Sequence, residues 1–319
     1  MTDIYSQQHR NRKVTIILMI SFLILLGLLG YAIDIYSFGT IGMTGIPAAT
    51  IIALSLASIN GLASYFYGDK IVLSSLHAGA LVFENPSHKR LRNVVTEMAI
   101  ASGSPLPKIY VIDDPAPNAF ATGRNPQNAT LGVTQGLLDT MNREELQAVI
   151  AHEMGHIKNY DILTMTVVTV LVGTIALLSD WAVRTWRYGG IRTKRGSRSK
   201  GLHPVILLVI ILFVIISPIL SRIIAMAVSR QREYQADASS AEFTRNPIAL
   251  ASALEKISQT KSPVRTAHRA TAHLFISDPL QRKLDEKEGL FADIFSTHPP
   301  IQGRIDRLRR MAYIYSGRD

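Results

Sequence analysis

The feature that most constrains the fold of this chain is a series of long apolar blocks separated by polar and basic segments. Residues 14–33 carry no charged side chain, and a helix of about 20 residues spans the ~30 Å hydrocarbon core of a bilayer. A cleaved signal peptide has an apolar region of only ~7–15 residues, followed by a small-residue cleavage site. The length of the block therefore predicts a membrane helix that stays in the chain.

Three further apolar blocks repeat the pattern, at residues 41–67, 162–178 and 204–227. Tyr65, Phe66 and Tyr67 close the second block, as aromatic side chains do at a membrane interface. The first two blocks are therefore expected to form a helical hairpin. Blocks three and four enclose the basic segment 184–200, whose Gly and Ser content predicts a flexible loop. We expect an integral membrane protein with four membrane helices.

The charge and the absence of cysteine exclude other classes of protein. A net charge of +10 would suggest nucleic acid as a partner if the basic residues formed a compact soluble domain. Many of them instead flank the apolar blocks, where membrane proteins concentrate Lys and Arg, and no nucleic-acid-binding motif accompanies them. With no cysteine in the chain, disulfides and thiolate metal sites are excluded, so a zinc ion must be held by His and carboxylates.

Between the second and third blocks the sequence predicts a small soluble region. Residues 87–102 have apolar side chains at helical spacing. Short extended segments at 108–113, 115–123 and 129–133 predict an antiparallel sheet of two or three strands. An exposed edge strand there is suited to binding an extended substrate by strand addition. An ordinary β-meander fits the pattern equally well.

The motif with the clearest chemistry is His152-Glu153-Met154-Gly155-His156. Asn142 and Glu145 form the signature of a helix N-terminus just before it. Histidines four residues apart lie on one face of a helix and are placed to share a metal ion, with the Glu between them reaching a water on that ion. The alternative is a His pair that is only packed or solvated.

A catalytic zinc usually has three protein ligands, so a third is needed. Glu233 and Asp237 stand four residues apart in the segment 229–237. Glu233 is placed to ligate the ion while Asp237 hydrogen-bonds the far nitrogen of a ligand histidine. A solvated helix face, with Arg230 and Arg232 paired to the two acids, explains the spacing equally well.

The order of four motifs resembles the HtpX family of membrane zinc peptidases, which are related to the CAAX prenyl endopeptidases. The motifs are NAFATG at 118–123, HEMGH at 152–156, SRQREYQAD at 229–237 and STHPP at 296–300. The resemblance runs from the first apolar block to about Arg310, with no departure at a motif position. It implies a mainly α membrane protein with a small antiparallel β-sheet and a zincin-like domain of the gluzincin type, which a hydrophobic hairpin splits in two.

The same resemblance implies the roles of individual residues. One zinc ion per chain would be bound by His152, His156 and Glu233. Glu153 would be the base that deprotonates the zinc-bound water, and Asp237 would support a ligand histidine. His298 would either donate to the oxyanion or have a structural role, and Arg304 is placed to pair with a carboxylate. The substrate cleft would be lined by Asn118, Ala119 and Phe120.

The implied function is a membrane-bound zinc endopeptidase that removes misfolded or damaged membrane proteins. Its partners would be unfolded or membrane-protein polypeptides and the lipid bilayer, with no nucleic acid and an oligomeric state that stays open. A processing enzyme like the CAAX prenyl endopeptidases is the enzymatic alternative. An inactive metal-binding membrane scaffold is the alternative from another class.

The blocks also predict the organisation of the chain. Residues 1–67 hold the tail and two membrane helices, 68–161 the first half of the protease domain, 162–227 the hydrophobic hairpin and 228–319 the second half. By the positive-inside rule, Arg10, Arg12 and Lys13 place the N-terminus and the active site on the cytoplasmic side of a prokaryotic plasma membrane. The same rule disfavours a basic 184–200 loop outside the cell, so the side of that loop stays open.

Overall fold

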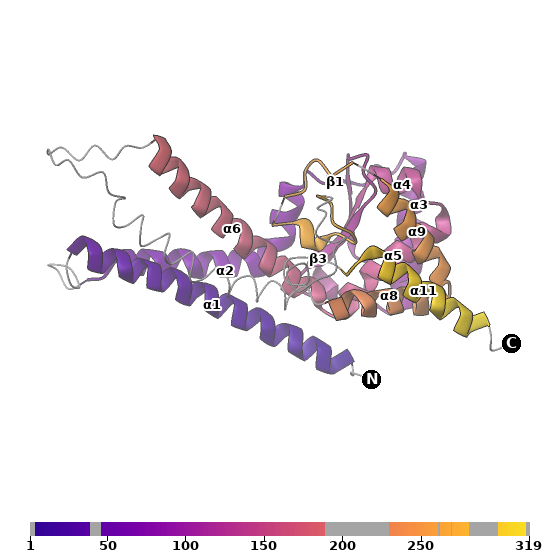
Figure 1. Ribbon diagram of the computed structural model, residues 1–319, viewed down its shortest axis with the longest axis horizontal. Helices are drawn as coiled ribbons and strands as arrows, with labels where there is room; N and C mark the ends of the chain where they lie inside the picture. The colour runs from indigo at the N-terminus through magenta and orange to yellow at the C-terminus, as the bar shows by residue number, and fades with distance from the viewer. Residues whose placement is uncertain are drawn as a thin grey trace.

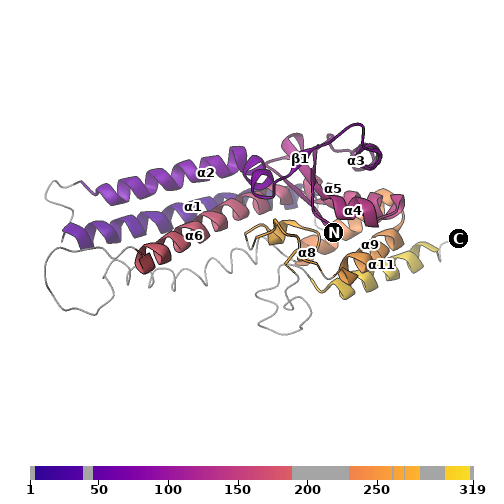
Figure 2. The ribbon, with the colours of Figure 1, turned by 90° about the horizontal axis from the view of Figure 1, so that it is seen from above.

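The computed structural model describes residues 4–38, 46–188, 230–260, 262–268, 270–280 and 299–316. Within these ranges, long helices project from one side of a globular part made of shorter helices and a sheet (Figure 1). The long helices are α1 (Ile4–Phe38), α2 (Ala48–Ser75) and α6 (Asp161–Tyr188), which lie side by side when the molecule is seen from above (Figure 2). The fourth apolar block and His298 lie outside the described residues.

Helices α1 and α2 are long and apolar enough to cross a membrane, over Gln8–Ile35 and Ala48–Ser75. Much of their apolar surface faces outward, with Ile17, Ile52 and Ile59 among the exposed side chains. An apolar surface of this size fits hydrocarbon rather than water. The first two predicted spans are therefore confirmed as candidate membrane helices.

One buried carboxylate of α1 caps the start of α2. Pro47 precedes α2 and gives it no side-chain cap. Asp34 of α1 instead accepts hydrogen bonds from the Ala49 and Thr50 amides, at 2.9 and 2.8 Å, and from the Thr50 hydroxyl at 2.7 Å. The backbone amides at the start of α2 thus find their hydrogen-bond acceptor on the neighbouring helix α1.

The third apolar block forms α6, which leaves the preceding helix α5 (Arg143–Lys158) at a sharp corner. The two helices meet at 85° across Asn159 and Tyr160, and Tyr160 has a left-handed φ of 61°. By length and composition, the two helices together are either one broken membrane span or a re-entrant segment. The described part of the chain therefore holds two candidate spans, or three if this pair crosses. The corner places the end of α5 beside the start of α6.

The sheet has the order β1-β2-β4-β3 and is mixed. The strands are β1 (Gly79–Ala80), β2 (Lys108–Ile112), β3 (Ala119–Gly123) and β4 (Ala129–Thr134). β1 and β3 pair antiparallel with their neighbours, whereas β2 and β4 run parallel. The prediction of a purely antiparallel sheet is therefore wrong. Strand β4 lies between β2 and β3. Because β3 follows β2 in the chain but takes the outer edge, β4 returns antiparallel to β3 and runs parallel to β2.

The remaining helices surround α5. They are α3 (Pro86–Ser102), α4 (Gln135–Thr140), α8 (Arg230–Thr244), α9 (Pro247–Gln259) and α11 (Ile301–Ser316), with short 3-10 turns at Pro126–Asn128 and Ala272–Leu274. The helical spacing at residues 87–102 is thus confirmed by α3. Helix α5 contacts α3, α8, α9 and β3, and its side chains are buried from Glu145 to Ile157 except Gln147. The predicted motif helix is the centre of the globular part.

Candidate active site

Helix α5 is fixed at its start by the predicted capping box. The Asn142 side chain accepts from the Glu145 amide and the Glu145 carboxylate accepts from the Asn142 amide, both at 2.9 Å. Lys256 and Ser252 of α9 also donate to Glu145, each at 2.7 Å. The helix that carries the motif therefore starts at a defined residue and is tied to α9.

From this start the motif histidines fall on one buried face. The rings of His152 and His156 lie 4.8 Å apart and nearly perpendicular. Glu233 reaches them from α8, with carboxylate oxygens 3.8 Å from His152 Nε2 and 3.5 Å from His156 Nε2. All three side chains are buried, and one ligand atom from each lies within 4.8 Å of the others. The tertiary fold thus brings Glu233 to the two histidines, the nearer of which precedes it by 77 positions in the sequence (from 156 to 233).

The Nδ1 nitrogen of each motif histidine lies beside a carboxylate. His152 Nδ1 lies 3.0 Å from Asp237 Oδ1, and His156 Nδ1 lies 3.0 Å from Asp161 Oδ2. A carboxylate beside Nδ1 favours a proton on that nitrogen, so in the neutral rings Nε2 would be the nitrogen that binds a metal ion. The predicted support by Asp237 is seen at His152. The sequence did not predict the role of Asp161, although an acidic residue directly after the motif helix could have indicated a partner for a motif histidine.

The residues present fit a zinc ion. Among the described residues, His152 Nε2 is buried without a hydrogen-bond partner. The two Nε2–carboxylate separations are longer than hydrogen bonds. They are close to the ~3.4 Å expected between two ligands that each stand ~2.0–2.2 Å from a tetrahedral ion. Two neutral imidazoles and a carboxylate are also the donor set that a cysteine-free zinc site requires.

Arg304 of α11 closes the site from the other side and is itself almost fully buried. Its guanidinium donates to both oxygens of Asp237, at 2.9 and 2.6 Å, and to the Ile276 carbonyl at 2.7 Å. Nη1 also lies 3.4 Å from Glu233 Oε2. The predicted pairing of Arg304 with a carboxylate is confirmed.

Burial and charge move the pKa values of the two histidines apart. Burial, together with the Arg304 charge, lowers the pKa of His152 to about 4, against the pull of Asp237. Burial also opposes protonation of His156, but Asp161, Glu233 and Glu153 outweigh it and raise its pKa to about 9. Binding of a metal ion by His156 would therefore compete with protonation of its ring.

Glu153 stands in the same charge cluster. It is 1% exposed, and its charge acts on both His156 and Arg304. Glu153 stands between the two histidines of the candidate metal site and close to them. A general base that activates a metal-bound water is expected at this position.

Two of the predicted cleft residues, Ala119 and Phe120, begin the edge strand β3, and Asn118 directly precedes it. Asn118 is 2% exposed, and Ala119 and Phe120 are fully buried. At these residues, the free edge of the sheet is already occupied by hydrogen bonds with residues 276–277 of the same chain. Ile276 N donates to the Ala119 carbonyl at 2.9 Å, and Asn118 Nδ2 donates to Ser277 O at 3.2 Å. Their role in a substrate cleft stays a prediction.

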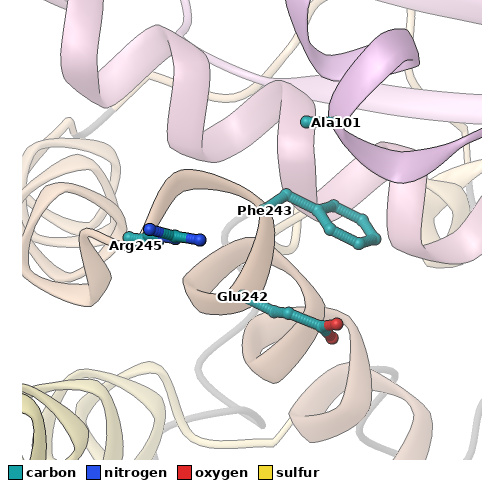
Figure 3. A pocket seen from close by; sticks show the side chains of 4 residues that line it. All are labelled: Ala101, Glu242, Phe243 and Arg245. Atoms are coloured by element: carbon teal, nitrogen blue, oxygen red, sulfur yellow. The ribbon is translucent and has the colours of Figure 1, made fainter.

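A separate surface pocket of about 660 Å³ opens near the ends of α3 and α8 (Figure 3). Ala101, Glu242, Phe243 and Arg245 line it. None of the three clustered ligand residues is among them. The pocket therefore does not belong to the His–His–Glu site.

A buried His–His–Glu cluster on a zincin-like helical domain that carries membrane helices defines a membrane metallopeptidase. A sequence profile of Peptidase family M48 matches residues 86–312. A protease HtpX homolog of Caldanaerobacter subterraneus subsp. tengcongensis is 44% identical over 310 residues, covering 97% of this chain and 98% of the relative. A protease HtpX homolog of Streptococcus pneumoniae is 41% identical over 311 residues, covering 97% and 100%.

The chain belongs to peptidase family M48, in its HtpX group. Its substrates are accordingly polypeptides and its environment is a lipid bilayer. The fold is similar to that of Ste24p from S. mikatae, with a TM-score of 0.50 at 20% identity. That match covers 81% of this chain and 57% of Ste24p, and at this identity it shows the fold alone.

Proposed function

We propose that this protein is a zinc-dependent endopeptidase that cleaves misfolded or damaged membrane proteins at the cytoplasmic surface of a prokaryotic plasma membrane. The observation that carries the proposal is the buried cluster of His152, His156 and Glu233 with Glu153 beside it. A scaffold needs no buried carboxylate in the position of the base. Relatives that are named as proteases match nearly the whole chain, and they support the same function.

In this proposal each residue of the site has a distinct task. His152, His156 and Glu233 hold one zinc ion, while Asp237 and Asp161 keep the imidazole rings oriented. When bound, zinc supplies a Lewis acid that polarises the scissile carbonyl and lowers the pKa of water towards ~7. Glu153 accepts the proton of the attacking water and returns it to the leaving amine.

Five further residues complete the proposed machinery. Arg304 holds Asp237 and Glu233 in place, through the contacts described above. His298, outside the described residues, is proposed to donate to the oxyanion. Substrate is proposed to lie along β3 at Asn118, Ala119 and Phe120, once the segment 275–277 shifts from that edge.

The contacts of α1 support the cytoplasmic orientation. Gln8 donates to the Lys158 carbonyl at 3.1 Å and Asn11 donates to Asp161 at 2.8 Å, so the N-terminal end of α1 lies at the α5–α6 corner. We therefore propose that the metal cluster lies on the same side of the membrane as the N-terminus, whichever side loop 184–200 occupies. Arg10, Arg12 and Lys13 assign that side to the cytoplasm by the positive-inside rule.

The proposal also explains how the two soluble segments are joined. Residues 68–161 supply two ligands and residues 228–319 supply the third, with the hydrophobic segment between them. A single ion bound by both halves would stabilise their packing as well as catalyse the reaction.

The test is proteolysis by the full-length protein in detergent, with an unfolded membrane protein as substrate and bound zinc measured in parallel. The wild type should carry one zinc per chain, lose activity to a chelator and regain it with zinc. Glu153→Gln should keep the zinc and lose cleavage. Full activity of this variant, or activity that no chelator affects, would overturn the proposal.

The same assay separates the alternatives. Cleavage restricted to a prenylated CAAX peptide would identify a processing enzyme instead. A wild-type protein that binds zinc and cleaves neither substrate would identify a scaffold.

A further inference from the structure

The N-terminal end of helix α1 is packed against the corner that carries the metal cluster. Asn11 is 3% exposed, on a helix whose residues Ile16 and Ile17 face outward. Its Nδ2 donates to the Asn159 carbonyl at 3.0 Å and to Asp161 Oδ1 at 2.8 Å. Both amide protons are therefore used at the corner.

Asp161 connects this amide to the cluster. It is 3% exposed. One carboxylate oxygen receives Asn11 while the other holds His156 Nδ1 at 3.0 Å. A carboxylate held at both oxygens by different partners has its plane fixed, and it fixes the imidazole in turn. The residues Asn11, Asp161 and His156 thus form one continuous chain of hydrogen bonds.

Neighbouring contacts hold α1 in register with this chain. The Thr15 and Thr164 hydroxyls lie 3.1 Å apart, and the Arg12 guanidinium lies 4.8 Å from the centre of the Tyr160 ring. Tyr160 is the residue with the left-handed backbone at the corner. The amide of Asn11 is therefore delivered to Asp161 by a docked helix rather than by a flexible tail.

We propose that Asn11 is a positioning residue of the metal centre, and that helix α1 is a part of the active site as well as a membrane anchor. The inference rests on the proposed metal site. Without the amide, Asp161 Oδ1 loses a hydrogen bond at a buried position, and Arg232 Nη1, 3.6 Å away, is the competing partner. The carboxylate then rotates towards Arg232, and the His156 ring, which is hydrogen-bonded to it, changes its orientation. Changes to residues that orient a metal ligand typically reduce metal affinity about 10–100-fold.

The test uses the full-length protein in detergent and measures zinc affinity by competition with a chromophoric chelator at fixed pH. Asn11→Leu keeps the side-chain volume and removes the amide. We expect it to bind zinc about tenfold more weakly than the wild type and to shift the visible spectrum of the cobalt-substituted protein. Thr15→Val is the matched control, because it lies on the same buried face and does not touch Asp161.

A coupled measurement tests whether Asn11 acts through Asp161. If it does, the double variant of Asn11→Leu and Asp161→Asn should bind zinc about as tightly as Asp161→Asn alone, because neighbouring residues of one network are not additive. Additive losses would overturn the inference. So would unchanged affinity in Asn11→Leu, or an equal loss in Thr15→Val, which would indicate helix docking in general.

The proposed function has its own mode of failure. If the wild type binds no zinc, both proposals fall together. If it binds zinc and cleaves substrate while Asn11→Leu keeps full affinity, only the role of Asn11 is rejected.

Discussion

Arg304 and Asp237 form a buried two-point ion pair, with Nε on one carboxylate oxygen at 2.9 Å and Nη2 on the other at 2.6 Å. Burial alone favours a neutral acid, but the Arg304 charge and the bond to His152 hold the pKa of Asp237 below its usual range. Since Asp237 also supports His152, the pair links α11 and α8 to the motif helix.

Replacing Arg304 with Met should be strongly destabilising. The change leaves a buried carboxylate without its cation, which typically costs about 3–5 kcal/mol. We expect a lower apparent Tm in detergent and weaker retention of zinc. Arg309→Met is the control, because Arg309 pairs with Glu255 at the surface, where ion pairs contribute little. Equal Tm values for the two variants would contradict this account of Arg304.

Gly155 sets the distance between α5 and α8. A Cβ at this position would lie 3.0 Å from Ser239 Cβ and 3.3 Å from Ala236 Cα. Gly155→Ala should therefore push α8, and Glu233 with it, away from the histidines. Strain of this kind costs about 1–3 kcal/mol.

The expected result for Gly155→Ala is a loss of zinc affinity, measured by chelator competition. Ser239→Gly removes the opposing atom, so the double variant should recover most of that affinity. A double variant no better than Gly155→Ala would show that the contact with Ser239 is not the cause.

Asp34 should stabilise the α1–α2 pair by capping α2. Asp34→Ala leaves the Ala49 and Thr50 amides without this acceptor, and the loss of an N-cap typically costs about 0.5–2 kcal/mol. Thermal unfolding in detergent should therefore show a lower Tm for Asp34→Ala. Asp34→Asn keeps an acceptor oxygen that caps nearly as well, and it should lie closer to the wild type. The reverse order would indicate that the charge, and not the cap, matters.

Glu145 should make stability depend on pH in the acid range. Burial favours its neutral form, but hydrogen bonds from Lys256, Ser252 and the Asn142 amide outweigh it and lower its pKa below the model-peptide value of 4.5. A lowered folded-state pKa contributes stability that is present above pH 4.5 and is lost as the pH falls through the folded-state pKa.

Comparison with Glu145→Gln isolates this contribution, since Gln also serves in a capping box. On metal-free protein, the Tm advantage of the wild type should be constant from about pH 7 to pH 5 and should shrink below about pH 4.5. A difference in Tm that does not change with pH would rule out the charged form as its source.

The sheet shows where local patterns fail. Residues 108–113 and 129–133 were recognisable as strands, and α5 was predictable down to its capping box. The parallel pairing of β2 with β4 was not predictable, because it depends on the order of the strands in the sheet. Short-range signals in a sequence contain no information on that order.

The site divides in the same way. The sequence by itself determined the ligand types, since a chain without cysteine has only His and carboxylates for zinc, and helical spacing placed His152 and His156 together. It also determined the apolar spans. Only the tertiary structure decided which acid each histidine contacts, and that α1 brings Asn11 to Asp161. Those contacts join residues up to 150 positions apart, and such pairs follow from packing of whole helices rather than from local spacing.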